Sequence, residues 1–150
     1  MKHTSIIATL LVAGLCAALP TACKSDQPAW VQAEQKQQTD PASLRGVKWV
    51  CVSINADAMT SAEPITLDFN ADGTVTGFSG INRFSAPYTA GTGSLSFGPI
   101  AATRMGGSAE SMGQEQRFLQ ALAKIKVFSL QSGLLRLSDG GKKQLLEFSR

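Results

Sequence analysis

Hydrophobic and polar residues alternate through much of the chain at a period of two, which is typical of half-buried β-strands. Residues 47–54 (VKWVCVSI) form an apolar, β-branched run, and residues 64–69 alternate hydrophobic with polar side chains. The tight turn 70–73 (NADG) follows, in which Gly73 is free to take a positive φ. Residues 74–78 then return, so the pattern predicts a core strand followed by an antiparallel hairpin.

The same signals predict strands in the rest of the chain. Residues 55–63 are expected to form a loop. Residues 88–90 and 94–97 flank the turn Gly91-Thr92-Gly93 and predict a second hairpin, which an extended connection at 100–105 follows. Three short strands separated by glycine-containing turns are predicted to finish the chain, and these are 127–130, 134–137 and 144–148.

One longer segment has the period of a helix. Ser111, with Gln114 three residues later, is a capping-box pattern that predicts where this helix begins. Asp40 followed by Pro41 predicts a separate single turn of helix that runs to Leu44. The long helix is expected to carry a hydrophobic stripe and a polar face. The stripe comprises Met112, Phe118, Leu119, Leu122 and Ile125, and the polar face comprises Gln116, Arg117, Gln120 and Lys124.

Together these elements predict a mainly β fold with one α-helix. About seven or eight antiparallel strands make a sheet long enough to twist and curl, and one helix can cover the gap that remains.

The N-terminus has the pattern of a targeting segment. Lys2 precedes an apolar run at 6–19, which is too short to span a bilayer comfortably, since about 20 residues are needed. Small residues then precede Cys23, and this arrangement resembles a bacterial lipobox with Cys23 as the acylated residue. Pro20 stands where that pattern has Leu, so cleavage after Ala22 by the ordinary signal peptidase and an uncleaved anchor stay open as alternatives.

These segments predict the domain organisation. We expect a lipoprotein-type signal peptide at 1–22, a lipidated N-terminus with a flexible polar tether at 23–43, and one folded domain at 44–150. Several acyl chains on Cys23 would anchor the protein stably in a membrane. Lys24 stands where enteric-type bacteria place the Asp that retains lipoproteins in the inner membrane. By that resemblance we expect the outer membrane, facing the periplasm, with a soluble periplasmic protein as the alternative.

Charge and residue usage argue against several classes of function. The net charge is +3, and the only basic pair is Lys142-Lys143, whereas a nucleic-acid surface needs a basic stripe. The only histidine, His3, lies in the predicted signal peptide, which leaves the mature chain without a Ser–His or Cys–His pair. We therefore expect no enzyme, cofactor, metal or nucleic-acid partner. Cys51 lies in the first strand without a disulfide partner, which predicts a buried structural thiol.

Several blocks of the domain resemble, in the right order, the META domain of HslJ-type proteins. The first is a strand that carries Trp49. Residues 67–84 (LDFNADGTVTGFSGINRF) are similar to the family block LxFxxDGxVxGxxGCNRF. The other matching features are Tyr88, residues 95–105 (LSFGPIAATRM), an early Glu in the helix at Glu115, and the tail at 133–148.

The resemblance implies an open, cracked antiparallel β-barrel formed by a single META-type domain after the signal peptide and tether. It also implies an envelope location and links to heat stress, drug tolerance or motility, but no catalytic mechanism. The family often has Cys in the Gly-Cys-Asn block and again just after Thr-Arg-Met, where this chain has Ile81 and Gly107. Both are missing together, as expected if they form a bridge in relatives, and we expect Ile81 to hold its place by packing.

The most distinctive polar residues are Asn82, Arg83, Thr103 and Arg104, which we predict to form a polar surface cluster. Two arginines at a barrel mouth could hold a carboxylate or phosphate through paired N–H donors. In the structural interpretation, which we favour, Asn82 occupies a left-handed turn and the arginine stems cover apolar surface.

Two functions follow from this sequence. The first is a stress-related interaction or assembly-support lipoprotein, with another envelope protein as its partner. The alternative is a binding protein that holds a small apolar molecule, such as a lipid tail, inside the barrel. A filled interior would favour the first function. All seven phenylalanines could point inward, namely Phe69, Phe78, Phe84, Phe97, Phe118, Phe128 and Phe148.

Overall fold

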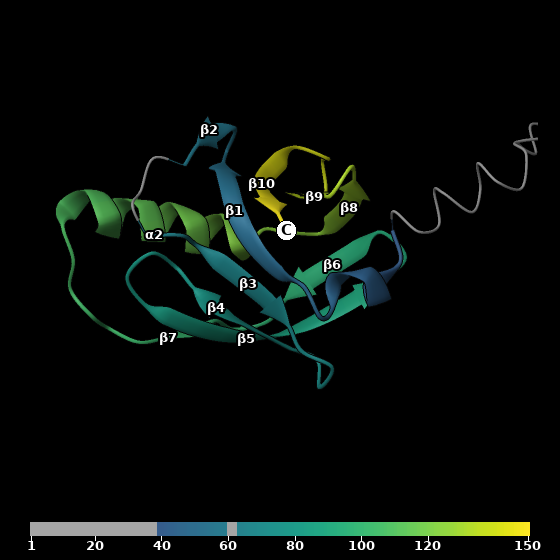
Figure 1. Cartoon of the computed structure of the whole chain (residues 1–150), viewed down its shortest axis with the longest axis horizontal. Helices are drawn as coiled ribbons and strands as arrows, with labels where there is room; N and C mark the ends of the chain where they lie inside the picture. Colours follow the sequence, from purple (N-terminus) through teal and green to yellow (C-terminus); the bar gives the residue numbers. More distant parts are fainter. Residues whose placement is uncertain (1–38, 60–62) are drawn as a thin grey trace, which may run out of the picture.

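The computed structural model describes residues 39–59 and 63–150, so the predicted signal peptide and Cys23 lie outside the described residues. Its strands curl around a common core, and α2 lies across one side of them (Figure 1). The elements in chain order are η1 (Pro41–Leu44), β1 (Lys48–Ile54), β2 (Asp57–Ala58), β3 (Thr66–Phe69), β4 (Thr74–Phe78), β5 (Arg83–Gly91), β6 (Ser94–Phe97), β7 (Ala101–Ala102), α2 (Ala109–Leu122), β8 (Val127–Gln131), β9 (Leu134–Ser138) and β10 (Gln144–Ser149).

Eight of the described strands form a closed antiparallel ring. Their order is β1, β3, β4, β5, β6, β8, β9 and β10, and β10 pairs with β1 to complete the barrel. The seam between β6 and β8 is sparse, because a single residue pair, Ser94 and Val127, joins the two strands there. The barrel with one helix confirms the predicted fold class, and this sparse seam is its weakest join.

The hairpin between β3 and β4 forms as predicted. Gly73 has a φ of +82°. The carboxylate of Asp72 accepts hydrogen bonds from the backbone N–H of Thr74 at 2.9 Å and from its hydroxyl at 2.6 Å. These bonds hold the pKa of Asp72 below its ordinary value, because they stabilise the ionised form. Local turn chemistry therefore fixes the register of the two strands.

The interior of the barrel is filled by large side chains. Trp49 and Phe118 are fully buried, as predicted, and the indole N–H of Trp49 donates to the carbonyl of Leu44 at 3.0 Å. Other buried core residues include Phe69, Phe84, Phe128 and Phe148. The expectation that every phenylalanine points inward is wrong for Phe78. Its strand buries Val75, and Phe78, three positions later, is on the opposite face and lines a surface groove.

The long helix begins earlier than predicted. Its N-cap is Ser108, whose hydroxyl accepts from the backbone N–H of Ser111 at 3.1 Å, so the predicted capping box at Ser111 is wrong. Phe118 and Leu122 face the barrel, whereas Met112, which we expected on the same stripe, is 50% exposed. All four residues of the predicted polar face are exposed, as predicted. Within the described residues, no helix is long and apolar enough to cross a membrane.

Two segments predicted as irregular contain short strands. β2 lies in the predicted loop 55–63 and pairs with the end of β1. β7 lies in the predicted connection 100–105 and pairs with Phe84 and Ser85 of β5. The single helical turn at Pro41–Leu44, capped by the Asp40 carboxylate, confirms its prediction.

Candidate functional site

The four residues of the predicted polar cluster have different surroundings. Asn82 is 4% exposed, so its predicted surface position is wrong, whereas Arg83, Thr103 and Arg104 are exposed. The left-handed conformation also belongs to another residue. Gly80 has a φ of +99°, and Asn82 has no positive φ. The conformational freedom of glycine thus supplies the turn, and the Asn82 side chain is free to point into the structure.

Asn82 is the centre of a hydrogen-bond network. Its side-chain oxygen accepts from the hydroxyl of Thr103 at 2.8 Å and from the backbone N–H of Met105 at 2.7 Å. Its amide nitrogen donates to the carbonyl of Met105 at 3.3 Å and to a carboxylate oxygen of Glu115 at 3.0 Å. The turn before β5 is thereby tied both to the 103–105 connection and to α2.

Glu115 is the network residue that only the family resemblance marked in the sequence. It lies on α2, and it also accepts a very short hydrogen bond from the hydroxyl of Ser79, which in turn donates to the carbonyl of Asn82. Nearby on the same helix, Gln114 is buried. Only the early Glu of the family pattern marked this position, since nothing local in the sequence shows that the helix packs on residues 79–82.

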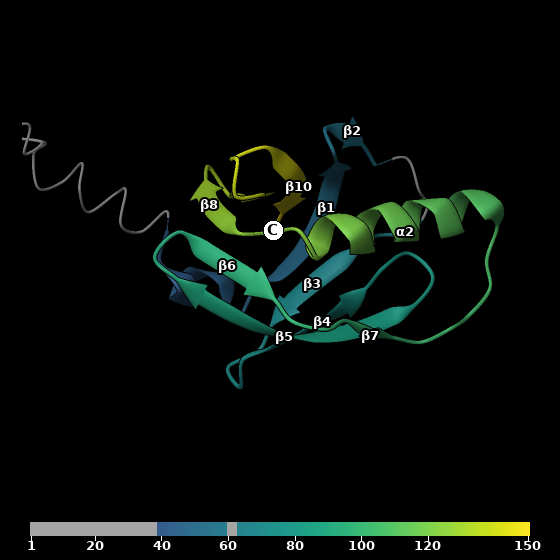
Figure 2. The same cartoon turned by 180° about the vertical axis from the view of Figure 1, so that it is seen from behind.

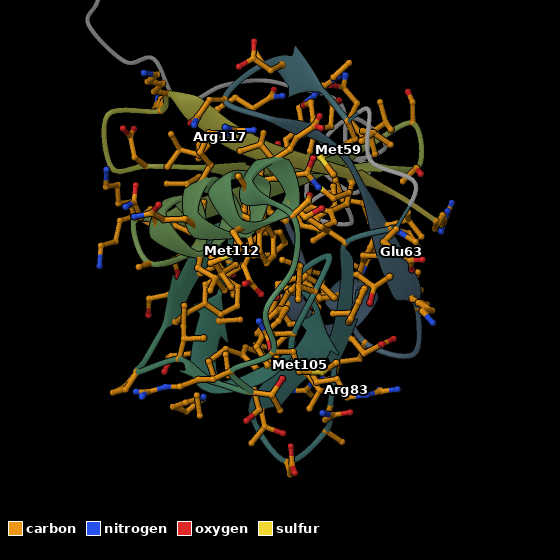
Figure 3. The ribbon with its side chains drawn as sticks, turned by 90° about the vertical axis from the view of Figure 1, so that its left-hand side faces the viewer. Met59, Glu63, Arg83, Met105, Met112 and Arg117 are labelled. Atoms are coloured by element: carbon orange, nitrogen blue, oxygen red, sulfur yellow. The ribbon has the colours of Figure 1, made fainter. Side chains whose placement is uncertain are left out.

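The two arginines of the predicted cluster do not share one site. Arg83 lines a groove on the outer face of the barrel, whereas Arg104 does not line it. Figure 3 looks onto the end of the molecule where α2 begins and shows Arg83 and Met105 below the helix that carries Met112. The structure therefore does not support the paired-arginine anion site, and Asn82 with Thr103 has a packing role.

The outer groove has a volume of about 810 Å³. Its floor is the outward face of β1, β3, β4 and β5, and the rim includes β7. One cross-strand row runs from Lys48 through Asp68 and Thr76 to Ser85. In the next row Phe78 stands between Thr66 and Arg83. The groove thus combines an aromatic side chain with charges of both signs.

Gly77 shapes the strand beneath this groove. A Cβ at Gly77 would lie 2.0 Å from the carbonyl oxygen of Thr66 and 2.9 Å from the ring of Phe84. Only a glycine therefore allows β3 and the Phe84 ring to approach β4 so closely. The concave outer face depends on this close approach of β3 and the Phe84 ring to β4.

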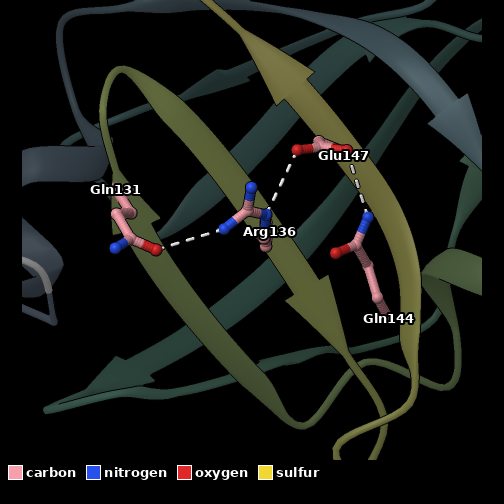
Figure 4. Close-up of polar contacts among 4 residues, drawn as sticks. All are labelled: Gln131, Arg136, Gln144 and Glu147. Atoms are coloured by element: carbon pink, nitrogen blue, oxygen red, sulfur yellow. Dashed lines mark hydrogen bonds and ion pairs between the residues drawn. The ribbon is translucent and has the colours of Figure 1, made fainter.

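A second polar row lies on β8, β9 and β10 (Figure 4). Arg136 donates to Glu147 at 3.2 Å and to Gln131 at 3.2 Å, and Gln144 donates to Glu147 at 3.1 Å. Arg136 and Glu147 are directly opposite each other in the sheet. Such a cross-strand pair contributes about 0.2–1 kcal/mol to strand pairing, which accounts for this row as sheet structure.

The cysteine of the folded domain is buried and unreactive. Cys51 is buried and has no disulfide partner, as predicted, and burial raises the pKa of its thiol to about 12. A thiol with that pKa stays protonated at neutral pH and is a poor nucleophile. Within residues 39–59 and 63–150, no group of three or more His, Cys, Asp or Glu residues is placed to hold a metal ion.

Solved structures of two proteins have a similar fold. One, described as an NMR structure of the protein from Burkholderia xenovorans, is 25% identical with a TM-score of 0.58, and the match covers 93% of this chain and 98% of the other. A second, described as an NMR structure of the protein, is also 25% identical with a TM-score of 0.59, and the match covers 73% of this chain and 92% of the other.

No curated protein gives a match to the chain. The model of the META domain family matches residues 42–150, a segment that includes the whole barrel, the helix and the Asn82 network. The chain therefore belongs to the META domain family.

Proposed function

We propose that this protein is a lipid-anchored envelope protein whose META barrel acts as a docking module for another envelope protein. One observation carries the docking role. The barrel interior is occupied by side chains such as Trp49, Phe118 and Phe148, and the large groove lies on the outer face. A partner segment would therefore bind outside the barrel, against β3, β4 and β5.

The chemistry of the groove suits a protein segment. Phe78 offers apolar contact area, the cationic Lys48 lies opposite the anionic Asp68, and the cationic Arg83 lies opposite Phe78. Aromatic and arginine side chains dominate the binding energy of many protein interfaces. The protonated, buried thiol of Cys51 also supports a non-catalytic role. The filled interior does not favour the alternative role of holding an apolar molecule inside the barrel.

Docking can be tested by site-specific photocrosslinking in cells. A photoreactive residue at Ser85, which lines the groove, should give a discrete adduct with an envelope protein. The matched position is Ser129, which is also an exposed serine in a strand, but on β8 outside the groove. Crosslinking before and after heat shock tests the stress link. Adducts that are absent at Ser85, or the same at both serines, would contradict the docking role.

Anchoring is tested separately at Cys23, which lies outside the described residues. The lipobox-like sequence is the support for this part of the proposal. Cys23→Ser should release the protein from the membrane fraction, because the acyl chains would no longer attach. If the wild-type protein is already soluble after cell fractionation, the lipid-anchor proposal fails, and the docking result still stands by itself.

A further inference from the structure

Four exposed lysines gather where two distant segments of the chain meet. Lys124 and Lys126 follow the end of α2, and Lys142 and Lys143 lie in the turn between β9 and β10. The turn packs against Lys126, because a Cβ at Gly140 would be 3.9 Å from the Cγ of that lysine. We define these four residues as the lysine end.

Buried and hydrogen-bonded neighbours hold these lysines on the surface. Ile125, between the first two, is 1% exposed and fixes the segment to the core. The backbone N–H of Lys126 donates to Ser138 at 2.9 Å, which joins this segment to the end of β9. The lysine side chains are therefore presented outward from a fixed backbone.

Negative charge is scarce along the stretch of chain that carries the lysine end. Residues 116–146 contain six Lys and Arg residues but a single acidic residue, Asp139. One oxygen of the Asp139 carboxylate accepts from the backbone N–H groups of Gly141 and Lys143, both at 2.9 Å, and thus holds the turn. The dipole of α2 accounts for a cation at Lys124, but not for the pair in the turn. The surface is therefore positively charged and suits an anionic partner.

The N-terminal chain joins the domain beside this end. The carbonyl of Thr39 accepts from the N–H of Gly93 at 3.0 Å, and the carbonyl of Gly93 accepts from Phe128 at 3.0 Å. The backbone carbonyl of Lys126 in turn accepts from the N–H of Leu95 at 3.1 Å. Figure 2 shows η1 and the start of β6 at the opposite end of the molecule from the start of α2.

We propose that the lysine end is a second membrane contact, which binds the anionic headgroups of the bilayer that holds the lipid anchor. This inference rests on the proposed anchor at Cys23, which precedes Thr39 by 16 positions. Even a fully extended chain of that length reaches about 55 Å, so the domain stays near the bilayer. Each lysine at an anionic surface strengthens binding about fivefold, and four of them are sufficient to orient the domain.

The experiment uses the full chain as the expressing cell processes it, purified in detergent and added to lipid vesicles. The vesicles contain either phosphatidylcholine alone or about 30% phosphatidylglycerol, at roughly 0.02 M and 0.5 M salt. Amine acylation read by mass spectrometry reports how accessible each lysine is, with Lys48 as the internal reference. The mass of the N-terminal peptide reports whether Cys23 is acylated.

Anionic vesicles at low salt should slow acylation of the lysine end at least fivefold relative to Lys48, and high salt should abolish that protection. Replacing all four lysines with Gln should weaken binding of the unanchored Cys23→Ser chain to anionic vesicles at least tenfold. A control removes four exposed cations elsewhere, namely Lys48, Arg83, Arg104 and Arg117, and should retain most of the binding.

Equal labelling of the four lysines on both kinds of vesicle would overturn the lysine-end contact. Equal losses of vesicle binding in the two charge variants would overturn it as well. Retention on heparin that matches the binding to anionic vesicles at the same salt would show a general affinity for polyanions and would also overturn it. An N-terminal peptide without acyl chains would instead refute the anchor. The comparison of the two variants on anionic vesicles would still decide the lysine-end contact.

Discussion

The amide of Asn82 donates a hydrogen bond to the carboxylate of Glu115 at 3.0 Å, and this contact ties the turn before β5 to α2 across 33 positions of sequence. The same Asn82 side chain accepts from Met105 in the connection between β7 and α2. One side chain therefore holds three segments together, and the hydrogen bond from Ser79 to Glu115 and the backbone bond from Thr103 to Arg83 support the same arrangement. Asn82 is best understood as a structural centre of the fold.

Asn82→Ala should lower the free energy of unfolding by about 2–4 kcal/mol, because it leaves the Met105 N–H and the Glu115 carboxylate without their partner. Urea unfolding of the purified protein at neutral pH measures this change. Arg83→Ala, one residue later on an exposed side chain, is the control and should change stability by less than about 0.5 kcal/mol. The reverse order of the two effects would show that the network contributes little.

Gly77→Ala should destabilise the protein by about 3 kcal/mol. The new methyl group would lie 2.0 Å from a backbone oxygen of Thr66, which cannot move without breaking the β3–β4 pairing. Gly106→Ala is the matched control, because a Cβ at Gly106 meets nothing within 4 Å and should be tolerated. Thermal unfolding of both variants checks the prediction, and equal melting temperatures would contradict the close strand contact.

The sequence predicts the strands well where local chemistry determines them. The Asp72-Gly73 turn fixes the β3–β4 hairpin, and both partners of that turn lie within a few residues of each other. The helix start was missed because Ser108 and Ser111 are both acceptable caps, and only packing selects Ser108. Features that depend on tertiary contacts, such as the start of this helix, cannot be predicted from local sequence patterns.

The predicted cluster shows the same limit. Four polar residues were predicted to form one surface cluster, but among them only the side chains of Asn82 and Thr103 share a hydrogen bond. Asn82 is buried because Met105 and Glu115, which lie 23 and 33 positions later, surround its side chain. No local periodicity encodes such distant partners, so burial of a polar side chain was not predictable there.

Stability should fall at high pH because of Cys51. Its folded pKa of about 12 lies above the ordinary thiol value of 9.0, so above pH 9 the unfolded chain loses this proton before the folded protein does. Between pH 9 and 12 this one group should remove about 1.4 kcal/mol of stability per pH unit. Urea unfolding at a series of pH values gives the free energy of unfolding of the wild-type protein and of Cys51→Ala. Plotted against pH, the two free energies should differ in slope between pH 9 and 12 and run parallel below pH 9. Parallel curves throughout would show that the thiol is not buried.

Ile81 and Gly107 are placed closely enough for an engineered disulfide. A Cβ at Gly107 would lie 2.6 Å from the Cδ1 and 3.1 Å from the Cγ1 of Ile81, and Gly107 has no positive φ that would strain a side chain. A cysteine pair replacing these two residues should therefore reach the separation of about 3.5–4.5 Å that disulfide Cβ atoms need. The structure thus brings together the two positions at which the family resemblance implies a cysteine pair.

The double variant Ile81→Cys with Gly107→Cys should form this bridge on oxidation. Closing a loop of this length should make the oxidised form about 3–4 kcal/mol more stable than the reduced form of the same protein. Peptide mapping identifies the bond, and unfolding with and without reductant measures the gain, so that the lost packing of Ile81 cancels. Ile81→Cys with Gly106→Cys is the control, because a Cβ at Gly106 has no neighbour within 4 Å. A bridge that forms as readily in the control would mean that the connection before α2 moves too freely to hold Gly107 against Ile81.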